Sequence, residues 1–167
     1  MKALELALTA LEDMLVTEFR TCQLLHVLVR EERKAMLQGN NEALKKILQD
    51  KETCLAELKK LENSCRDEIQ EIGLLHGMAS TCLKLKDILP KIERFTADRM
   101  LHLSKGTDAL VQEIQEINQG NQALAKSKQE EATNPSRDNQ PTPQNGNGRK
   151  HLEISQIQVS YLFNSNK

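Results

Sequence analysis

Apolar residues recur at every seventh position through residues 1–37 of the chain. The two columns they form are Leu8, Leu15, Cys22, Val29 and Met36, and Leu4, Leu11 and Leu25, with Glu18 interrupting the second column. A period of seven places both columns along one stripe of an α-helix, which is the pattern of a coiled-coil seam. We therefore expect a helix over residues 2–37 that packs lengthwise against other helices.

The composition favours an all-α fold. Aromatic residues are 2% of the chain, with no Trp, one Tyr and three Phe. Strands are enriched in β-branched and aromatic residues, so a β-sandwich or barrel of this composition would be unusual. Leu, Lys, Glu, Gln and Ala dominate instead, and these residues favour helices. The expected fold is an elongated antiparallel helical bundle or coiled coil of three main helices with a short connecting helix.

A second helix is expected over residues 41–72. Its apolar residues at helical spacing are Leu44, Ile47, Leu48, Leu55, Leu58, Leu61, Cys65, Ile69 and Ile72. Residues 39–41, Gly-Asn-Asn, separate it from the first helix, since Gly suits the position after a helix and Asn an N-cap. So short a break favours an antiparallel hairpin, and a continuous kinked helix is the alternative. Lys51 lies on the apolar face, where we expect its ammonium group to reach water along its own stem. Gly73 and Gly77 are expected to end this helix.

The third long helix is expected over residues 91–130, after a short helix at 80–89 that Pro90 stops. Leu103, Leu110, Ile117 and Leu124 fall at intervals of seven along it. The positions three residues after the first three of these are Gly106, Glu113 and Gly120, so one column of the seam is apolar and the other is nearly empty. Each interior glycine costs about 1 kcal/mol relative to Ala. Two explanations are open: close helix packing against the glycines, or a groove for a partner helix.

The composition changes sharply near residue 133. Residues 133–150 contain three of the four prolines and no Leu, Ile, Val, Met or aromatic residue. Such a stretch cannot bury enough apolar area to offset chain entropy, which predicts a helical domain at 1–132 and a disordered linker at 133–150. The tail at 151–167 contains Tyr161 and Phe163 in an alternating, strand-like pattern typical of a docking peptide. Pairing back onto its own domain, or terminal disorder, are the alternatives.

The charge balance and the apolar runs exclude several partners. The net charge is −1, so no overall field draws the chain to nucleic acid or to an anionic membrane. The longest charge-free run, 154–166, is rich in Ser, Gln and Asn, so no membrane insertion is expected. Glu5 interrupts the apolar stretch that a secretory signal would need. Four Cys without an export signal predict reduced thiols and a cytoplasmic protein.

No catalytic constellation stands out, and we expect neither an enzyme nor a cofactor. The many Asp and Glu residues lie among Lys and Arg on helical faces, as on solvated surfaces. Cys22 and His26 lie one helical turn apart, and a hairpin would bring Cys54 near them, as zinc or copper would require. However, there is no CxxC pair, and a thiol on an apolar seam behaves as a small hydrophobe.

Three segments together resemble the FlgN family of flagellar type III export chaperones. The first is LVREERKAMLQGNNEALKKILQDKETCLAELKKLE at 28–62, a helix, a Gly-Asn break and a Lys-Glu-rich second helix. The second is GLLHGMASTCLKLKDILP at 73–90, similar to the Gly-Leu connection and short helix of the family. The third is EIQEINQGNQALAK at 113–126, in which Asn118 and Asn121 resemble the Asn-x-x-Asn stretch of the family.

The resemblance implies a non-enzymatic, cytoplasmic chaperone that binds hook–filament junction proteins and delivers them to flagellar export gate components. Clients of this kind expose amphipathic terminal helices, and such a helix could complete an incomplete seam. The residues expected to bind partners are Leu103, Leu110, Ile114, Ile117, Asn118, Asn121, Leu124, Tyr161 and Phe163. The alternatives are a structural coiled-coil subunit of a larger assembly and a thiol or metal sensor, and a homo-oligomer is compatible with the seam.

Overall fold

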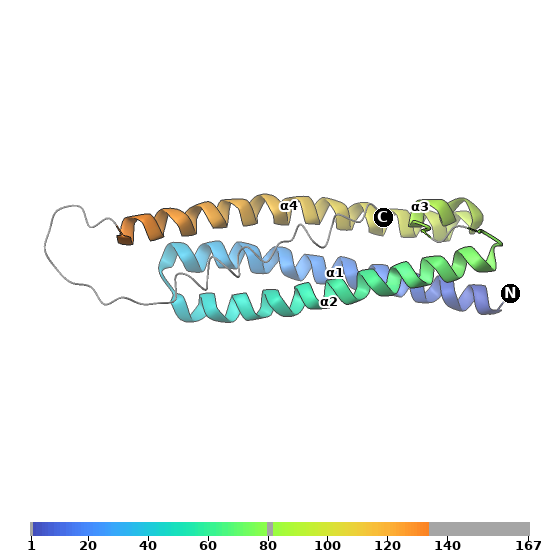
Figure 1. The fold of residues 1–167 in the computed structure, drawn as a ribbon, viewed down its shortest axis with the longest axis horizontal. Helices are drawn as coiled ribbons and strands as arrows, with labels where there is room; N and C mark the ends of the chain where they lie inside the picture. Colours follow the sequence, from blue (N-terminus) through green and yellow to red (C-terminus); the bar gives the residue numbers. More distant parts are fainter. Residues whose placement is uncertain (1, 80–81, 134–167) are drawn as a thin grey trace, which may run out of the picture.

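Four α-helices make up the computed structural model, which describes residues 2–79 and 82–133 (Figure 1). They are α1 (Lys2–Gln38), α2 (Asn41–Leu75), α3 (Leu85–Ile88) and α4 (Arg94–Thr133), and a 3-10 turn, η1 (Leu89–Lys91), follows α3. No strand occurs among the described residues. The prediction of an all-α, elongated helical bundle is confirmed. The linker and tail predicted beyond residue 133 lie outside the described residues.

The helices α1 and α2 form an antiparallel hairpin, not one kinked helix. Gly39 adopts a φ of +67°, a conformation that L side chains rarely adopt. The Asn40 amide then donates to the Ala35 carbonyl over 3.0 Å and closes the end of α1. The Asn40 side chain in turn accepts a hydrogen bond of 3.1 Å from the Ala43 amide and begins α2. Two adjacent residues therefore stop one helix and start the next.

From Leu11 onward the stripe predicted on α1 is the stripe that the structure buries, whereas Leu4 and Leu8 are half-buried. Its buried residues between Leu11 and Met36 include Leu11, Leu15, Glu18, Cys22, Leu25, Val29, Glu32 and Met36. The facing stripe of α2 contains Leu48, Lys51, Cys54, Leu58, Cys65, Ile69 and Ile72. On α1 these residues follow one another at alternating intervals of four and three, and on α2 at intervals of three, four or seven, which keeps each stripe directed at its partner helix, as in a coiled coil.

The connection from α2 to α4 differs from the prediction. Residues 82–84 are not helical, and α3 covers only one turn within the predicted 80–89, because Asp87 accepts from the Lys84 amide over 2.8 Å and starts the turn there. Gly73 does not end α2, which continues to Leu75. Instead, Gly73 is packed so closely that an added Cβ would lie 2.0 Å from Cδ1 of Leu83. Gly77, at a φ of +70°, provides the turn.

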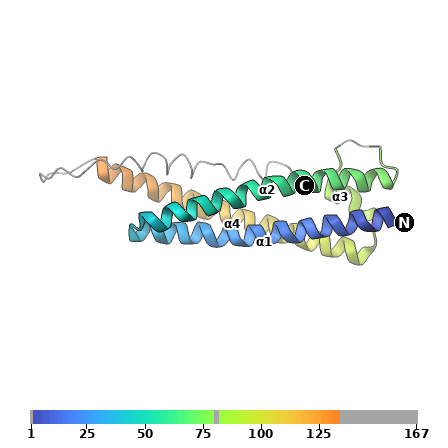
Figure 2. The same cartoon turned by 90° about the horizontal axis from the view of Figure 1, so that it is seen from below.

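The last helix, α4, runs back parallel to α1 and packs along it, while its C-terminal end extends past the α1–α2 turn (Figures 1 and 2). It begins three residues later than predicted because the Glu93 carboxylate caps it, accepting from the Phe95 and Thr96 amides over 3.0 Å each. Near its other end, the Lys128 ammonium donates to the Met36 carbonyl, in the last turn of α1.

Apolar and polar residues alternate along the core. The first apolar level lies at the end of the bundle that holds the N-terminus and consists of Ala7, Leu11, Leu15, Cys65, Ile69, Ile72, Leu83, Leu85, Ile88 and Met100. The second apolar level consists of Cys22, Leu25, Val29, Cys54, Leu58, Val111 and Ile114. The first polar level, at the intervening positions of α1 and α4, consists of Glu18, Thr21, Ser104 and Thr107. The second polar level, beyond the second apolar level, consists of Glu32, Lys51, Asn118 and Asn121.

Candidate partner-binding surface

The buried stripe of α4 contains few apolar residues. Its residues follow one another at alternating intervals of four and three: Met100, Ser104, Thr107, Val111, Ile114, Asn118 and Asn121. Only Met100, Val111 and Ile114 among them are apolar. The sequence predicted a different seam, the column of Leu103, Leu110, Ile117 and Leu124, and the structure leaves these four residues half-buried beside the true stripe. Asn118 and Asn121 hold central positions because the buried charges of Lys51 and Glu32 face them.

The nearly empty column of α4 is occupied by side chains of α1. Four pairs recur at intervals of seven on both helices: Glu12 with Arg99, Phe19 with Gly106, His26 with Glu113, and Arg33 with Gly120. An added Cβ at Gly106 would lie 2.9 Å from the Phe19 ring, and one at Gly120 would lie 2.7 Å from the Arg33 guanidinium. Of the two explanations for the glycines, close helix packing is therefore the one that the structure shows.

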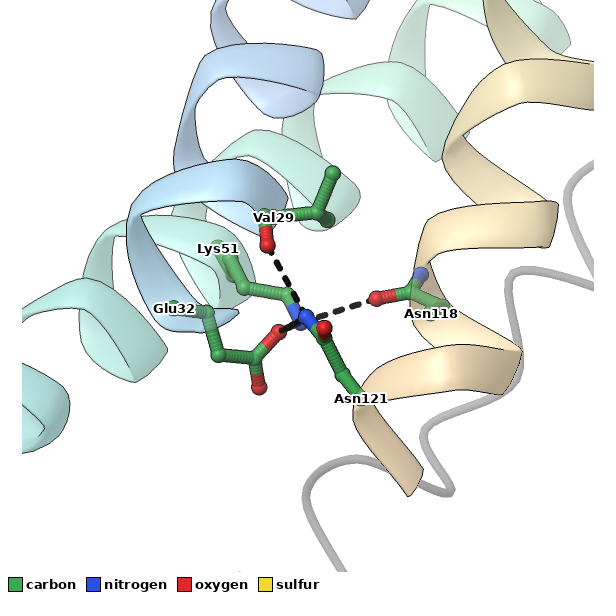
Figure 3. Close-up of polar contacts among 5 residues, drawn as sticks. All are labelled: Val29, Glu32, Lys51, Asn118 and Asn121. Atoms are coloured by element: carbon green, nitrogen blue, oxygen red, sulfur yellow. Dashed lines mark hydrogen bonds and ion pairs between the residues drawn. The ribbon is translucent and has the colours of Figure 1, made fainter. Parts of the chain in front are cut away.

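A buried polar cluster joins all three long helices (Figure 3). The Lys51 ammonium of α2 donates to the Glu32 carboxylate of α1 over 2.6 Å and to the Asn118 side-chain oxygen of α4 over 3.2 Å. The Asn121 side-chain amide donates to the same carboxylate over 2.9 Å and to the Val29 carbonyl over 2.8 Å. Each of the two asparagines thus makes a hydrogen bond to one member of the ion pair.

The burial of Lys51 contradicts the expectation that its ammonium reaches water. Lys51 is 5% exposed and Glu32 is fully buried, so both charges lie in the core. A buried charge is tolerated when it is paired and hydrogen-bonded. The ion pair and two asparagines meet this condition, although the side-chain oxygen of Asn121 is buried without a hydrogen-bond partner among the described residues. The signal that could have revealed the cluster was Glu32 on the α1 seam, at seam spacing from Glu18.

The structure brings most of the predicted partner-binding residues together on α4, but turns them toward the bundle. Leu103 packs against the first apolar level, and Leu110 and Ile117 pack against the second. Ile114 is completely buried, and Asn118 and Asn121 lie in the polar cluster. Leu124 is half-buried farther along the helix. Tyr161 and Phe163 lie outside the described residues. A partner can reach the inner part of this face only when α4 loosens from α1.

The cysteines do not form a metal centre in the part of the chain that the structure describes. Cys22 and Cys54 both lie in the second apolar level, and His26 instead faces Glu113, with 3.1 Å between the ring nitrogen and the carboxylate oxygen. No group of three or more His, Cys, Asp or Glu side chains among these residues could hold a metal ion. Desolvation, followed by the charges of Glu57 and Asp50, raises the pKa of the Cys54 thiol. This thiol is therefore a packing group and a poor nucleophile.

Comparisons with known proteins agree with the resemblance seen in the sequence. The model of the FlgN protein family matches residues 1–133. No curated protein and no solved structure matches the chain. Within the described ranges, no helix combines the length and the apolar character that a membrane span requires.

Proposed function

The chain belongs to the FlgN family of flagellar export chaperones, and on this premise we propose that it binds the amphipathic terminal helices of secreted hook–filament junction proteins. Binding would hide the apolar faces through which these clients assemble, until the chaperone delivers them to the flagellar export gate. Client binding and delivery take place in the cytoplasm and involve no catalysis. The family is a chaperone family and not an enzymatic one.

One observation carries the proposal: α4 is the least firmly packed of the long helices. It spans 40 residues, yet among those whose burial the structure describes, only Met100, Val111 and Ile114 are buried apolar residues. The burial of an aliphatic side chain contributes about 1.5–3 kcal/mol, so α4, with three buried apolar residues and the half-buried leucines beside them, is held less firmly than α1 and α2, which bury more apolar residues. Gly106 and Gly120 lower its intrinsic helix stability further. A helix held in this way can loosen at a cost that a binding partner can offset.

The binding face follows from the half-buried residues of α4. A client helix would pack along Leu103, Leu110, Ile117 and Leu124, and would reach Ile114, Asn118 and Asn121 as α4 loosens from α1. The interaction is of the helix-in-groove kind, in which apolar residues at helical spacing fill the seam of the partner. Tyr161 and Phe163 would serve as a separate docking segment. Self-association through the same seam is compatible with this role.

The proposal is tested by isolating the tagged chain from flagellated cells and identifying the proteins bound to it. We expect a soluble, defined complex with a secreted junction protein. Leu124→Asp should weaken this complex at least tenfold, since about 1.4 kcal/mol corresponds to a factor of ten and one buried Leu contributes more. Gln119→Asp, on the exposed side of α4, is the matched control and should bind normally.

The melting temperature separates binding from folding in the same experiment. If Leu124→Asp lowers the affinity and leaves the melting temperature nearly unchanged, α4 carries the client site. Equal losses of both would make Leu124 a residue of the bundle and contradict the proposed face. Self-association without any client would instead indicate a structural coiled-coil subunit.

A further inference from the structure

We propose that Glu32 and Lys51 form an amide-reading site on the α1–α2 hairpin, which selects helices carrying Asn or Gln at two seam positions three residues apart. In the structure, α4 covers this site and fills the groove that α1 and α2 form around it. In a complex, the proposed occupant of the groove is a partner helix that carries the same pair of amide side chains. The inference rests on the proposed function, since it names the kind of helix that the chaperone would accept where α4 now lies.

The ion pair belongs to the hairpin itself and not to α4. Glu32 lies on α1 and Lys51 on α2, and the 2.6 Å contact between them involves no atom of α4. Any helix that covers this part of the groove must therefore meet a buried carboxylate and a buried ammonium. A Leu or Ile opposite them would remove a hydrogen bond from Lys51 and another from Glu32 without replacing either.

The two asparagines of α4 show which side chains satisfy the pair. An amide contains both an acceptor and a donor. Asn118 uses its oxygen to accept from Lys51, and Asn121 uses its nitrogen to donate to Glu32 (Figure 3). Carboxylates cannot donate and ammonium groups cannot accept, so neither class of charged residue can take both positions. The spacing of three residues places the two amides on adjacent turns of one helix face.

The spacing of the polar levels also sets the register of the occupant. Ser104 and Thr107 precede Asn118 and Asn121 by fourteen residues, and Glu18 precedes Glu32 by the same interval. Val111 and Ile114 lie midway, in the second apolar level. A helix shifted by one heptad would place either its branched apolar pair against the ion pair or its amide pair against the second apolar level, depending on the direction of the shift. The expected partner helix therefore runs parallel to α1 with a branched apolar pair seven residues before its amide pair.

Four full-length chains test the amide preference inside the molecule. They are the wild type, Asn118→Leu with Asn121→Leu, Glu32→Met with Lys51→Met, and the combination of all four changes. Hydrogen exchange is measured at α4 amides, with α1 amides as the internal reference. We expect each double variant to exchange at least tenfold faster in α4 than the wild type, and the combined variant to recover much of this protection. Unchanged or slower exchange in the Asn118→Leu, Asn121→Leu chain would overturn the proposal.

A labelled peptide tests the groove as a binding site for a separate helix. The probe is a peptide of residues 98–126, and its matched control carries leucine at 118 and 121. Both are titrated into the full-length Asn118→Leu, Asn121→Leu chain, whose own α4 fits the ion pair poorly. We expect the amide peptide to bind at least tenfold more tightly than the leucine peptide, and the preference to disappear when Glu32→Met and Lys51→Met are added. Equal binding, a reversed preference or no binding of either peptide overturns the inference.

Co-purification of client proteins tests the proposed function separately from the amide-reading site. Client proteins that co-purify equally with the wild type and with the Glu32→Met, Lys51→Met chain would leave the chaperone role intact and overturn the amide-reading site. If no client protein co-purified with the wild type while the peptide preference was retained, the chaperone role alone would be contradicted.

Discussion

Lys51 illustrates at the scale of a single residue how a buried charge depends on its partners. The ammonium lies within hydrogen-bond distance of the Glu32 carboxylate and the Asn118 side chain. Removing one member of a buried ion pair costs about 3–5 kcal/mol, whereas replacing both members by apolar residues is often nearly neutral.

We therefore expect Lys51→Met alone to lower the free energy of unfolding by about 3–5 kcal/mol, because the Glu32 carboxylate stays buried without the charge of Lys51. The double variant Glu32→Met, Lys51→Met should recover at least half of this loss. Urea unfolding of the three chains measures both effects. A double variant that is less stable than Lys51→Met would contradict this explanation.

The two interior glycines of α4 allow a matched comparison. The atom that would meet a Cβ at Gly120 belongs to the flexible end of Arg33, whereas the atom at Gly106 belongs to the Phe19 ring. Because Ala favours a helix over Gly by about 0.5–1 kcal/mol, Gly120→Ala should stabilise the chain by roughly that amount. Gly106→Ala should gain less or destabilise, since a ring cannot move aside as easily as a guanidinium. Thermal melts compare the two, and a larger gain at Gly106 would contradict the packing argument.

At the scale of the elements, the buried face of a helix could be predicted wherever large apolar residues at regular spacing form that face. The α1 stripe follows directly from Leu11, Leu15, Cys22 and Leu25. The α4 stripe could not be predicted in this way, because its central positions hold Ser104, Thr107, Asn118 and Asn121 while larger leucines lie beside them. The burial of Asn121 depends on its hydrogen bonds to Val29 and Glu32, which lie 92 and 89 residues earlier in the chain.

The start of α4 depends on the ionisation of Glu93. Hydrogen bonds from the backbone amides of Phe95 and then Thr96 lower the pKa of this carboxyl below its ordinary value of 4.5. A lowered pKa in the folded chain means that the cap stabilises the helix above pH 4.5 and that this contribution is lost as the pH falls through the lowered value.

We therefore expect Glu93→Gln to lower the melting temperature at pH 7, and the difference from the wild type to shrink as the pH falls below about 4.5. Asp108→Asn, at an exposed carboxylate on the same helix, is the control and should not show this change at pH 7. Thermal melts between pH 3 and pH 7 measure both differences. A Glu93→Gln effect that grows with acidification would contradict the assigned cap.

At the scale of the whole molecule, the three long helices differ in how many of the others they pack against. In the described residues, all three long helices supply buried apolar residues to both apolar levels, but only α1 packs extensively along both of the others. The sequence predicted three long helices and a short connecting one, and the structure has them. The sequence could not predict that α4 lies mainly on α1, because that arrangement depends on four residue pairs whose members are 87 residues apart.

That separation along the chain has a kinetic consequence. The hairpin closes over a two-residue turn, whereas the bonds from Asn121 to α1 span 89 and 92 residues. Contacts between distant residues form later because the entropy of loop closure must be lost first. During synthesis the delay is longer, since the 40 residues of α4 take about 2–8 s to assemble at 5–20 residues per second. Every newly made chain thus passes through an interval in which the hairpin is complete and its groove has no competing occupant.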